Sequence, residues 1–194
     1  RDRTQQRLYE SEIAQKDASL YALQAQLNPH FMYNTLDCIC GIANVSGTPQ
    51  IADVAVALAT MLRYSLSGKT IVPLTEEIEI VKNYLSIMEV RHPNFFTAEF
   101  NISPEAEELM CPKMLLQPII ENTFKHGFVP RTKNAHIVIS ANVDTDRLII
   151  TIFDNGKGFP KEILSELLNN FKQLNNSFYL PSNNSTCLLY TSDA

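Results

Sequence analysis

The sequence lacks any apolar run of the roughly 18 to 20 residues that a membrane-spanning helix requires, and it does not open with a signal peptide. It also has no cluster of basic residues, and its formal net charge is -5. These absences argue against a membrane span in this segment and against nucleic acid as its main partner. Hydrophobic residues make up 45% of the chain, so we expect a soluble, folded segment with no direct contact to nucleic acid.

Cysteine is scarce and is not arranged for metal binding. The only close pair is Cys38 and Cys40, a C-x-C spacing without a CxxC motif or a partner histidine, so the sequence does not indicate a zinc site. We interpret these two, with Cys111 and Cys187, as reduced cysteines that serve as small core residues.

The first 27 residues are polar and contain neither Gly nor Pro. Ile13, Leu20 and Leu27 recur there at seven-residue intervals. This repeat fits a short parallel coiled coil, and it also fits an ordinary amphipathic helix.

Helical patterns continue through the first half of the chain. Residues 29–40 are predicted to be helical, with a kink at Pro29, and residues 51–66 are predicted to form a second helix after a turn at 41–49. Another helix is predicted over 73–91, with acidic residues in its positive first turns. Two helices joined by a short turn make a hairpin, and two hairpins make a four-helix bundle.

The pattern changes at Phe95. Residues 95–102 read as a strand, 113–127 as a helix despite Pro118, and 135–143 with 148–153 as a hairpin. A helix, a hairpin and a glycine loop indicate a two-layer α/β sandwich, so the whole chain is predicted to be α+β.

The first segment whose residues could take part in a reaction is Asn28-Pro29-His30-Phe31, with Asn34 one helical turn later. An imidazole can act as a nucleophile towards a phosphoryl group. Asn34 lies at i+4 on the same face and could hold one ring nitrogen, which would leave the other free to attack. A helix-capping or core role for His30 is the competing interpretation of the residues alone.

The second segment is Glu121-Asn122-Thr123-Phe124-Lys125-His126-Gly127, late on a predicted helix. Asn122, Lys125 and His126 share a face at i+3 and i+4 spacing. An amide oxygen can ligate Mg²⁺, and Lys and His can donate to phosphates. A polar helix end would explain the same residues.

The third segment is Asp154-Asn155-Gly156-Lys157-Gly158, at the end of a hydrophobic strand. Glycines allow a backbone to approach a ligand closely, and a carboxylate at a strand end can accept a hydrogen bond from an adenine amino group. A plain turn is the alternative.

Taken in order, these segments resemble the sensor histidine kinases of two-component systems, in the LytS-like branch with an N-P-H-F-x-[FY]-N box. Four stretches of the sequence are similar to the YesM subgroup of that branch: residues 23–36, 62–66, 73–91 and 112–122. The resemblance runs from about Leu20 to about Leu168. It implies a helical-hairpin dimerisation region that forms a four-helix bundle in the dimer, followed by a sandwich of the histidine kinase ATPase type.

The resemblance also implies roles for individual residues. His30 matches the phosphorylated histidine of the family, with Asn34 as a candidate for its orientation, and ATP and Mg²⁺ are the implied cofactors. The residues that match ATP-site positions are Asn122 (through Mg²⁺), Lys125, His126, Asp154, Gly156 and Gly158. Many family members carry an acidic residue directly after the histidine, where this chain has Phe31. Either Asn34 suffices, or Asp37, about one turn further along, contributes a carboxylate.

The implied partners are a second copy of the chain and a response regulator, which the YesM subgroup suggests has an AraC-type output. The implied location is the cytoplasmic part of a protein anchored in the membrane. An alternative function is a catalytically incomplete dimerisation and phosphoacceptor module that is phosphorylated in trans. A chaperone or topoisomerase ATPase of the same Bergerat type would leave the 28–34 segment unexplained.

The chain departs from the family pattern after Phe159. Residues 161–174 look helical, but 175–194 are rich in Asn and Ser and contain no glycine, so a second glycine box and part of the sheet are expected to be missing. We therefore expect weak ATP binding and an uncovered sheet edge. The predicted divisions are 1–92 (coiled coil, dimerisation and phosphoacceptor region), 93–178 (partial ATP-binding domain) and 179–194 (a tail outside the family).

Overall fold

A computed structural model describes residues 28–128, 134–145, 147–158 and 186–193. The chain divides into two compact units, residues 1–67 and 68–194. Within the described residues, no helix combines the length and apolarity needed to cross a membrane. The predicted coiled-coil seam at 1–27 and the predicted helix at 161–174 lie outside the described residues.

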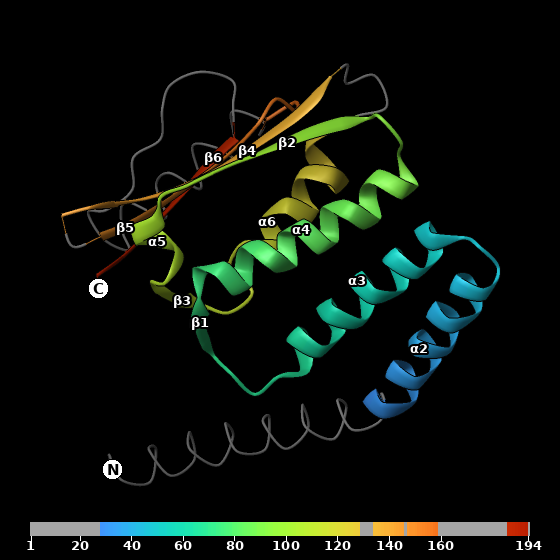
Figure 1. Cartoon of the computed structure of the whole chain (residues 1–194). Helices are drawn as coiled ribbons and strands as arrows, with labels where there is room; N and C mark the ends of the chain where they lie inside the picture. The colour runs from blue at the N-terminus through green and yellow to red at the C-terminus, as the bar shows by residue number, and fades with distance from the viewer. Residues whose placement is uncertain (1–27, 129–133, 146, 159–185, 194) are drawn as a thin grey trace, which may run out of the picture. The chain divides into compact units, whose positions relative to one another are not determined.

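The described part of the first unit is a hairpin of two helices, α2 (Pro29–Val45) and α3 (Pro49–Leu66) (Figure 1). Gly47 adopts a left-handed φ of 67° in the turn between them, where a residue without a Cβ is favoured. The helix therefore continues through Gly41 to Val45, five residues further than the sequence predicted. The Arg63 guanidinium lies 5.4 Å from the ring centroid of Tyr33 and links the two helices.

The sequence predicts that Pro29 kinks a helix. In the structure Pro29 instead occupies the first position of α2. Asn28 is the N-cap, and its Oδ1 accepts a hydrogen bond from the backbone N–H of Phe31 at 3.2 Å. Proline is well suited to this position because the first helical N–H groups have no partner within the helix. His30 is consequently in the first turn of α2.

The second unit contains a four-stranded sheet in the order β2-β4-β5-β6, whose bounds are β2 (Phe96–Ile102), β4 (Ala135–Asp144), β5 (Arg147–Asp154) and β6 (Thr186–Asp193). Strands β2 and β4 are parallel, and the other two pairs are antiparallel. A small second sheet pairs β1 (Ile71–Pro73) with β3 (Met110–Pro112). The predicted α+β fold is thus confirmed, and Figure 1 shows α4 and α6 on one face of the large sheet.

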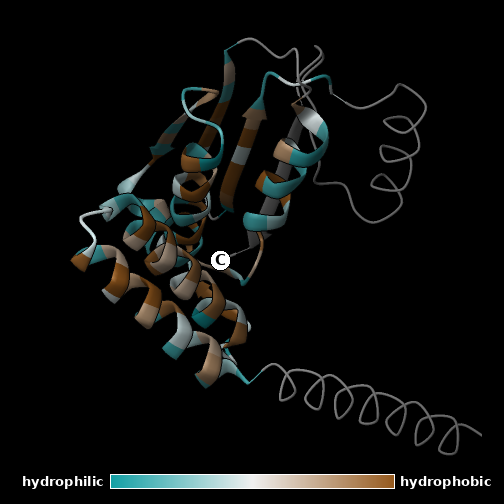
Figure 2. Ribbon diagram, turned by 90° about the vertical axis from the view of Figure 1, so that its right-hand side faces the viewer, coloured by the Kyte–Doolittle hydropathy of each residue, from teal (hydrophilic) through white to brown (hydrophobic). Residues whose placement is uncertain are grey.

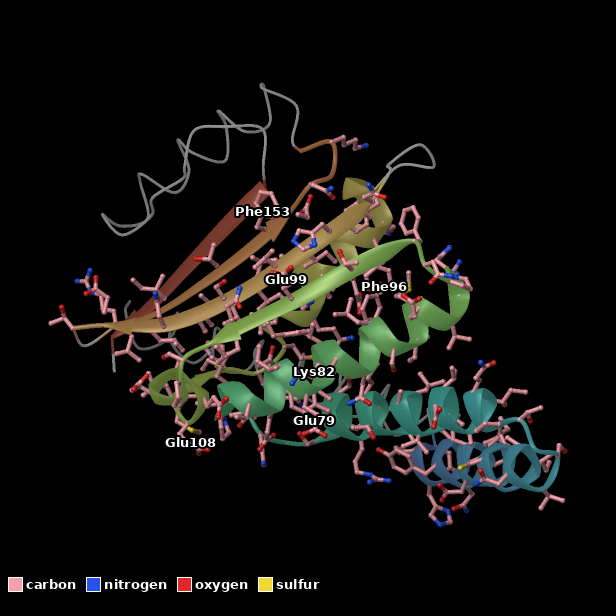
Figure 3. All side chains as sticks on the ribbon, turned by 45° about the horizontal axis from the view of Figure 1, so that its top comes forward. Glu79, Lys82, Phe96, Glu99, Glu108 and Phe153 are labelled. Carbon is pink, nitrogen blue, oxygen red and sulfur yellow. The ribbon has the colours of Figure 1, made fainter. Side chains whose placement is uncertain are left out.

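The helices of this unit are α4 (Leu74–Arg91), the short α5 (Pro104–Glu107) and α6 (Gln117–Asn122), which continues into the π-helical turn η1 (Thr123–Gly127). The helix predicted over 113–127 therefore begins four residues later than expected. Pro118 explains the difference, because it lacks an N–H and fits only the first turn of a helix. Lys82 of α4 lies beside the sheet, with its Nζ 5.2 Å from the ring centroid of Phe100 (Figure 3).

One face of the β4–β5 hairpin is apolar at every second residue. Ile137, Ile139, Ile150 and Ile152 are buried, as the alternation of a half-covered strand requires. Figure 2 shows the hydrophobic colouring of these strands. The same alternation carries β5 to its last residue, so Asp154 lies on the covered face and is only 3% exposed.

The tail of the chain contributes a strand. Strand β6 pairs with β5 from Arg147↔Asp193 to Asp154↔Thr186. The expectation that missing strands leave the sheet edge uncovered is therefore wrong at β5. This strand was missed from the sequence because residues 175–194 were judged as a whole by their Asn and Ser content, although Cys187-Leu188-Leu189-Tyr190 within them is apolar.

A buried carboxylate connects α4 to the segment that leads into α6. Glu77 is 1% exposed, and its two carboxylate oxygens accept hydrogen bonds from the backbone N–H groups of Met114 at 2.6 Å and Leu116 at 2.8 Å. Met114 has a left-handed φ of 60°, which a non-glycine residue adopts only when its surroundings hold it there. Glu77 thereby fixes the path of the chain into α6.

Replacing Glu77 with Gln is expected to lower the free energy of unfolding by about 2 kcal/mol. The amide nitrogen would face a backbone donor and leave that N–H without an acceptor. Urea denaturation measures the loss, and Glu79→Gln on the exposed side of the same helix is the matched control, with an expected change below about 0.5 kcal/mol. Equal effects of the two substitutions would contradict the role given to Glu77.

Candidate functional site

In the first unit, His30 is exposed in the first turn of α2. The side-chain amide nitrogen of Asn34 lies 3.4 Å from its Nδ1 and 3.3 Å from its Nε2. The i+4 spacing thus brings the two side chains together, as the sequence predicted. The amide contacts both ring nitrogens almost equally, so this rotamer does not single out one of them.

In the second unit, the strand end and the helix end meet at Asp154. Its Oδ1 accepts the backbone N–H of Gly156 at 2.9 Å, and its Oδ2 accepts the hydroxyl of Thr123 at 3.1 Å. Thr123 is the first residue of η1, directly after Asn122. The second and third segments of the sequence analysis are therefore joined by a direct hydrogen bond between their side chains.

The backbones of the two segments also touch. A Cβ placed on Gly156 would lie 2.7 Å from the carbonyl carbon and oxygen of Gly127, and the N–H of Lys157 donates to that same oxygen at 3.0 Å. Gly156 is thus required for backbone contact within the protein, whereas the sequence suggested approach to a ligand. Gly158 has a left-handed φ of 66°, which favours glycine.

Asn122, Lys125 and His126 are exposed around the end of α6 and η1. They are held in place by an aromatic cluster at the intervening residue Phe124. Its ring centroid lies 4.9 Å from Phe96, which Figure 3 labels on β2, and 5.8 Å from Tyr84 on α4. The π-helical turn keeps Phe124 and Thr123 inside while the polar side chains stay outside, and such turns recur at functional sites.

Burial and neighbouring charges shift the pKa values of three groups near these segments. Burial raises the pKa of Tyr84, the Glu121 carboxylate raises it further, and Arg91 partly offsets the shift. Burial and then the charge of Glu77 raise the pKa of the Cys111 thiol to about 12. The pKa of Lys113 is lowered by burial, against the opposing effect of Glu77 and Glu76. Cys111 therefore stays a protonated, unreactive thiol at neutral pH.

The donor set fits a nucleotide with a bound cation. Lys125 and His126 offer exposed donors to phosphate oxygens, and the exposed Asn122 amide offers an oxygen of the kind Mg²⁺ accepts. Asp154 accepts hydrogen bonds from two donors of the protein, and a carboxylate has about four positions that can accept a hydrogen bond. It can therefore take a further donor.

Sequence reasoning missed two residues of this arrangement, Thr123 and Glu77. Thr123 stood inside a segment already singled out, but the face of a helix that it occupies depends on the unforeseen π-helical turn. Glu77 had a readable signal, because it lies at i-4 from Val81 and so on the apolar face of its helix.

Gly156→Ala is expected to destabilise the second unit by about 1 to 3 kcal/mol, since the new methyl group would collide with the backbone of Gly127. Thermal unfolding monitors the loss. Gly127→Ala is the matched control, because its Cβ would meet its nearest neighbour, Asp154 Oδ1, at an ordinary 3.5 Å. If Gly156→Ala proved as stable as Gly127→Ala, the close contact of the two backbones would be refuted.

Two family models match the chain. The model described as histidine kinase matches residues 18–96. The model described as histidine kinase-, DNA gyrase B- and HSP90-like ATPase matches residues 111–185, and so extends into the 179–194 range that the sequence had assigned to a tail outside the family.

Curated relatives match most of the chain. Sensor protein LytS of Staphylococcus epidermidis is 32% identical over 154 residues, which cover 78% of this chain and 26% of that protein. Sensor histidine kinase YesM of Bacillus subtilis is 36% identical over 156 residues, 80% of this chain and 27% of that protein. LytS of Bacillus subtilis is 30% identical over 169 residues, 84% of this chain and 28% of that protein. The chain thus spans about a quarter of the length of these relatives.

Proposed function

The chain belongs to the sensor histidine kinase family, and on that premise we propose that the protein transfers the γ-phosphoryl group of ATP to His30 and from there to an aspartate of a response regulator. The observation that carries the proposal is the exposed imidazole of His30 in the first turn of α2, in contact with Asn34. An exposed ring can meet a donor that approaches from outside its own helix.

In the phosphorylation step, the lone pair of an unprotonated ring nitrogen of His30 attacks the γ-phosphorus. The bond from that phosphorus to the β–γ bridging oxygen breaks, and ADP leaves with the electron pair. Asn34 orients the ring in this proposal. The alternative, in which Asp37 accepts the proton that the ring loses, remains compatible with its exposed position on the same helix.

For the nucleotide, we assign the adenine end to Asp154, whose carboxylate accepts a hydrogen bond from the exocyclic amino group. Lys125 and His126 donate to the phosphates, and Asn122 supplies an oxygen to Mg²⁺, which neutralises phosphate charge when bound. Gly156 and Gly158 shape the loop beside the base. The Thr123–Asp154 hydrogen bond supports this assignment because it joins the phosphate-side and base-side segments into one site.

The remaining parts of the proposal concern the whole protein. Exposed apolar side chains on the helical hairpin, such as Phe31, Ile42 and Val56, support a homodimer in which two hairpins form a four-helix bundle. A response regulator with an AraC-type output is the proposed acceptor. The proposed location is the cytoplasmic side of a membrane, with an anchor outside this segment.

The direct test is incubation of the full-length protein that contains this segment with γ-labelled ATP and Mg²⁺. We expect label that is lost in acid and kept in base, as a phosphoramidate requires, and we expect His30→Gln to remove it. His92→Gln, at an exposed histidine beyond the end of α4, is the matched control and should retain the label.

Acid-stable label, or label that persists in His30→Gln, would refute the proposed acceptor. The alternative function, a phosphoacceptor module modified in trans, predicts a different pattern. The chain alone would stay unlabelled, and it would become labelled when mixed with a longer protein that contains the same regions but carries His30→Gln.

A further inference from the structure

The hydroxyl of Thr123 is placed to control Asp154. Thr123 is 5% exposed, and its Oγ1 lies 3.1 Å from Asp154 Oδ2 and 3.3 Å from the carbonyl oxygen of Ile119. A hydroxyl has one proton and can donate to only one of these acceptors at a time. The bond to the carboxylate is the shorter one, and a bond to a charged acceptor is stronger than one to a neutral carbonyl.

The two oxygens of Asp154 are held by different parts of the protein. Gly156 fixes Oδ1 from the loop that follows β5, and Thr123 fixes Oδ2 from η1. The loop contact comes from the same chain segment as Asp154, two residues further along. Among the described residues, the Thr123 hydroxyl is the one group that ties the carboxylate by a hydrogen bond to the helix end that carries Lys125 and His126.

We propose that Thr123 is a specificity-determining positioning residue: its hydroxyl holds the Asp154 carboxylate so that the remaining acceptor positions face a purine with an exocyclic amino group. This inference rests on the proposed function, in which Asp154 receives the base. A carboxylate fixed as an acceptor favours a 6-amino purine over a purine without that donor. A carboxylate that is free to turn loses this preference.

The side chain of Thr123 allows the hydroxyl to be separated from its bulk. Its methyl carbon lies 3.6 Å from the Cβ position of Gly127, so the methyl group fills space inside the turn. Thr123→Val keeps the volume and removes the hydroxyl. Thr123→Ser keeps the hydroxyl and removes the methyl group.

The test measures the affinity of the full-length protein that contains this segment for ATP and for purine riboside triphosphate, which has hydrogen in place of the 6-amino group. The unsubstituted protein should bind ATP about tenfold more tightly than the analogue, the size expected for one hydrogen bond to a charged acceptor. In Thr123→Val, ATP affinity should fall about tenfold with little change for the analogue. Thr123→Ser should restore most of the preference.

Equal weakening of both nucleotides in Thr123→Val would show a purely structural role and overturn the inference. So would a Thr123→Val protein that keeps the full preference for ATP. Failure of the proposed function gives a separate result, because the unsubstituted protein would then bind neither nucleotide. Binding of both with equal affinity would instead refute the assignment of the base to Asp154, and the inference with it.

Discussion

The arrangement of the second unit depends on the contact between the end of α6 with η1 and the end of β5. At that point, two glycine backbones approach so closely that a side chain on Gly156 would collide with Gly127. The carboxylate of Asp154 is held from both sides of the contact. Because backbone contact of this kind has little freedom to adjust, it fixes the relative position of all the side chains assigned to the nucleotide.

A second constraint acts on the opposite end of α6, where the chain enters the helix. Glu77 holds the backbone ahead of the helix, and β1 pairs with β3 immediately upstream. Strand β1 follows the boundary between the two units at Ser67 and Gly68. Strand β1, Glu77 and the segment that enters α6 therefore form one hydrogen-bonded framework within the second unit.

The sequence predicted the helices and strands that have a strong apolar periodicity. Its predictions were less accurate where tertiary contacts determine where an element begins or ends. The α2–α3 hairpin, α4, β2 and the β4–β5 hairpin follow from helical or alternating apolar patterns. The start of α2 at Pro29 was misjudged because a proline can either kink a helix or begin one. The choice depended on Asn28, whose side chain caps the helix.

In the candidate site, too, local patterns were predictable from the sequence and long-range contacts were not. The residue types at His30, Asn122 and Asp154 pointed to phosphoryl and nucleotide chemistry, and the i+4 contact of His30 with Asn34 was predictable from helical spacing. The Thr123–Asp154 bond was not, since it joins residues 31 positions apart and relies on a π-helical turn that has no simple sequence signal. Local patterns identify the groups, while long-range packing decides which of them meet.

The most direct test of this account is to follow the backbone amide NMR signals of the protein during titration with Mg-ATP. The largest shifts should fall on residues 122–127 and 154–158, the two segments that meet at Asp154. If the largest shifts fell instead on the far face of the sheet, around Thr97 and Glu99, with both of these segments unchanged, the nucleotide site would lie elsewhere and the account would be contradicted.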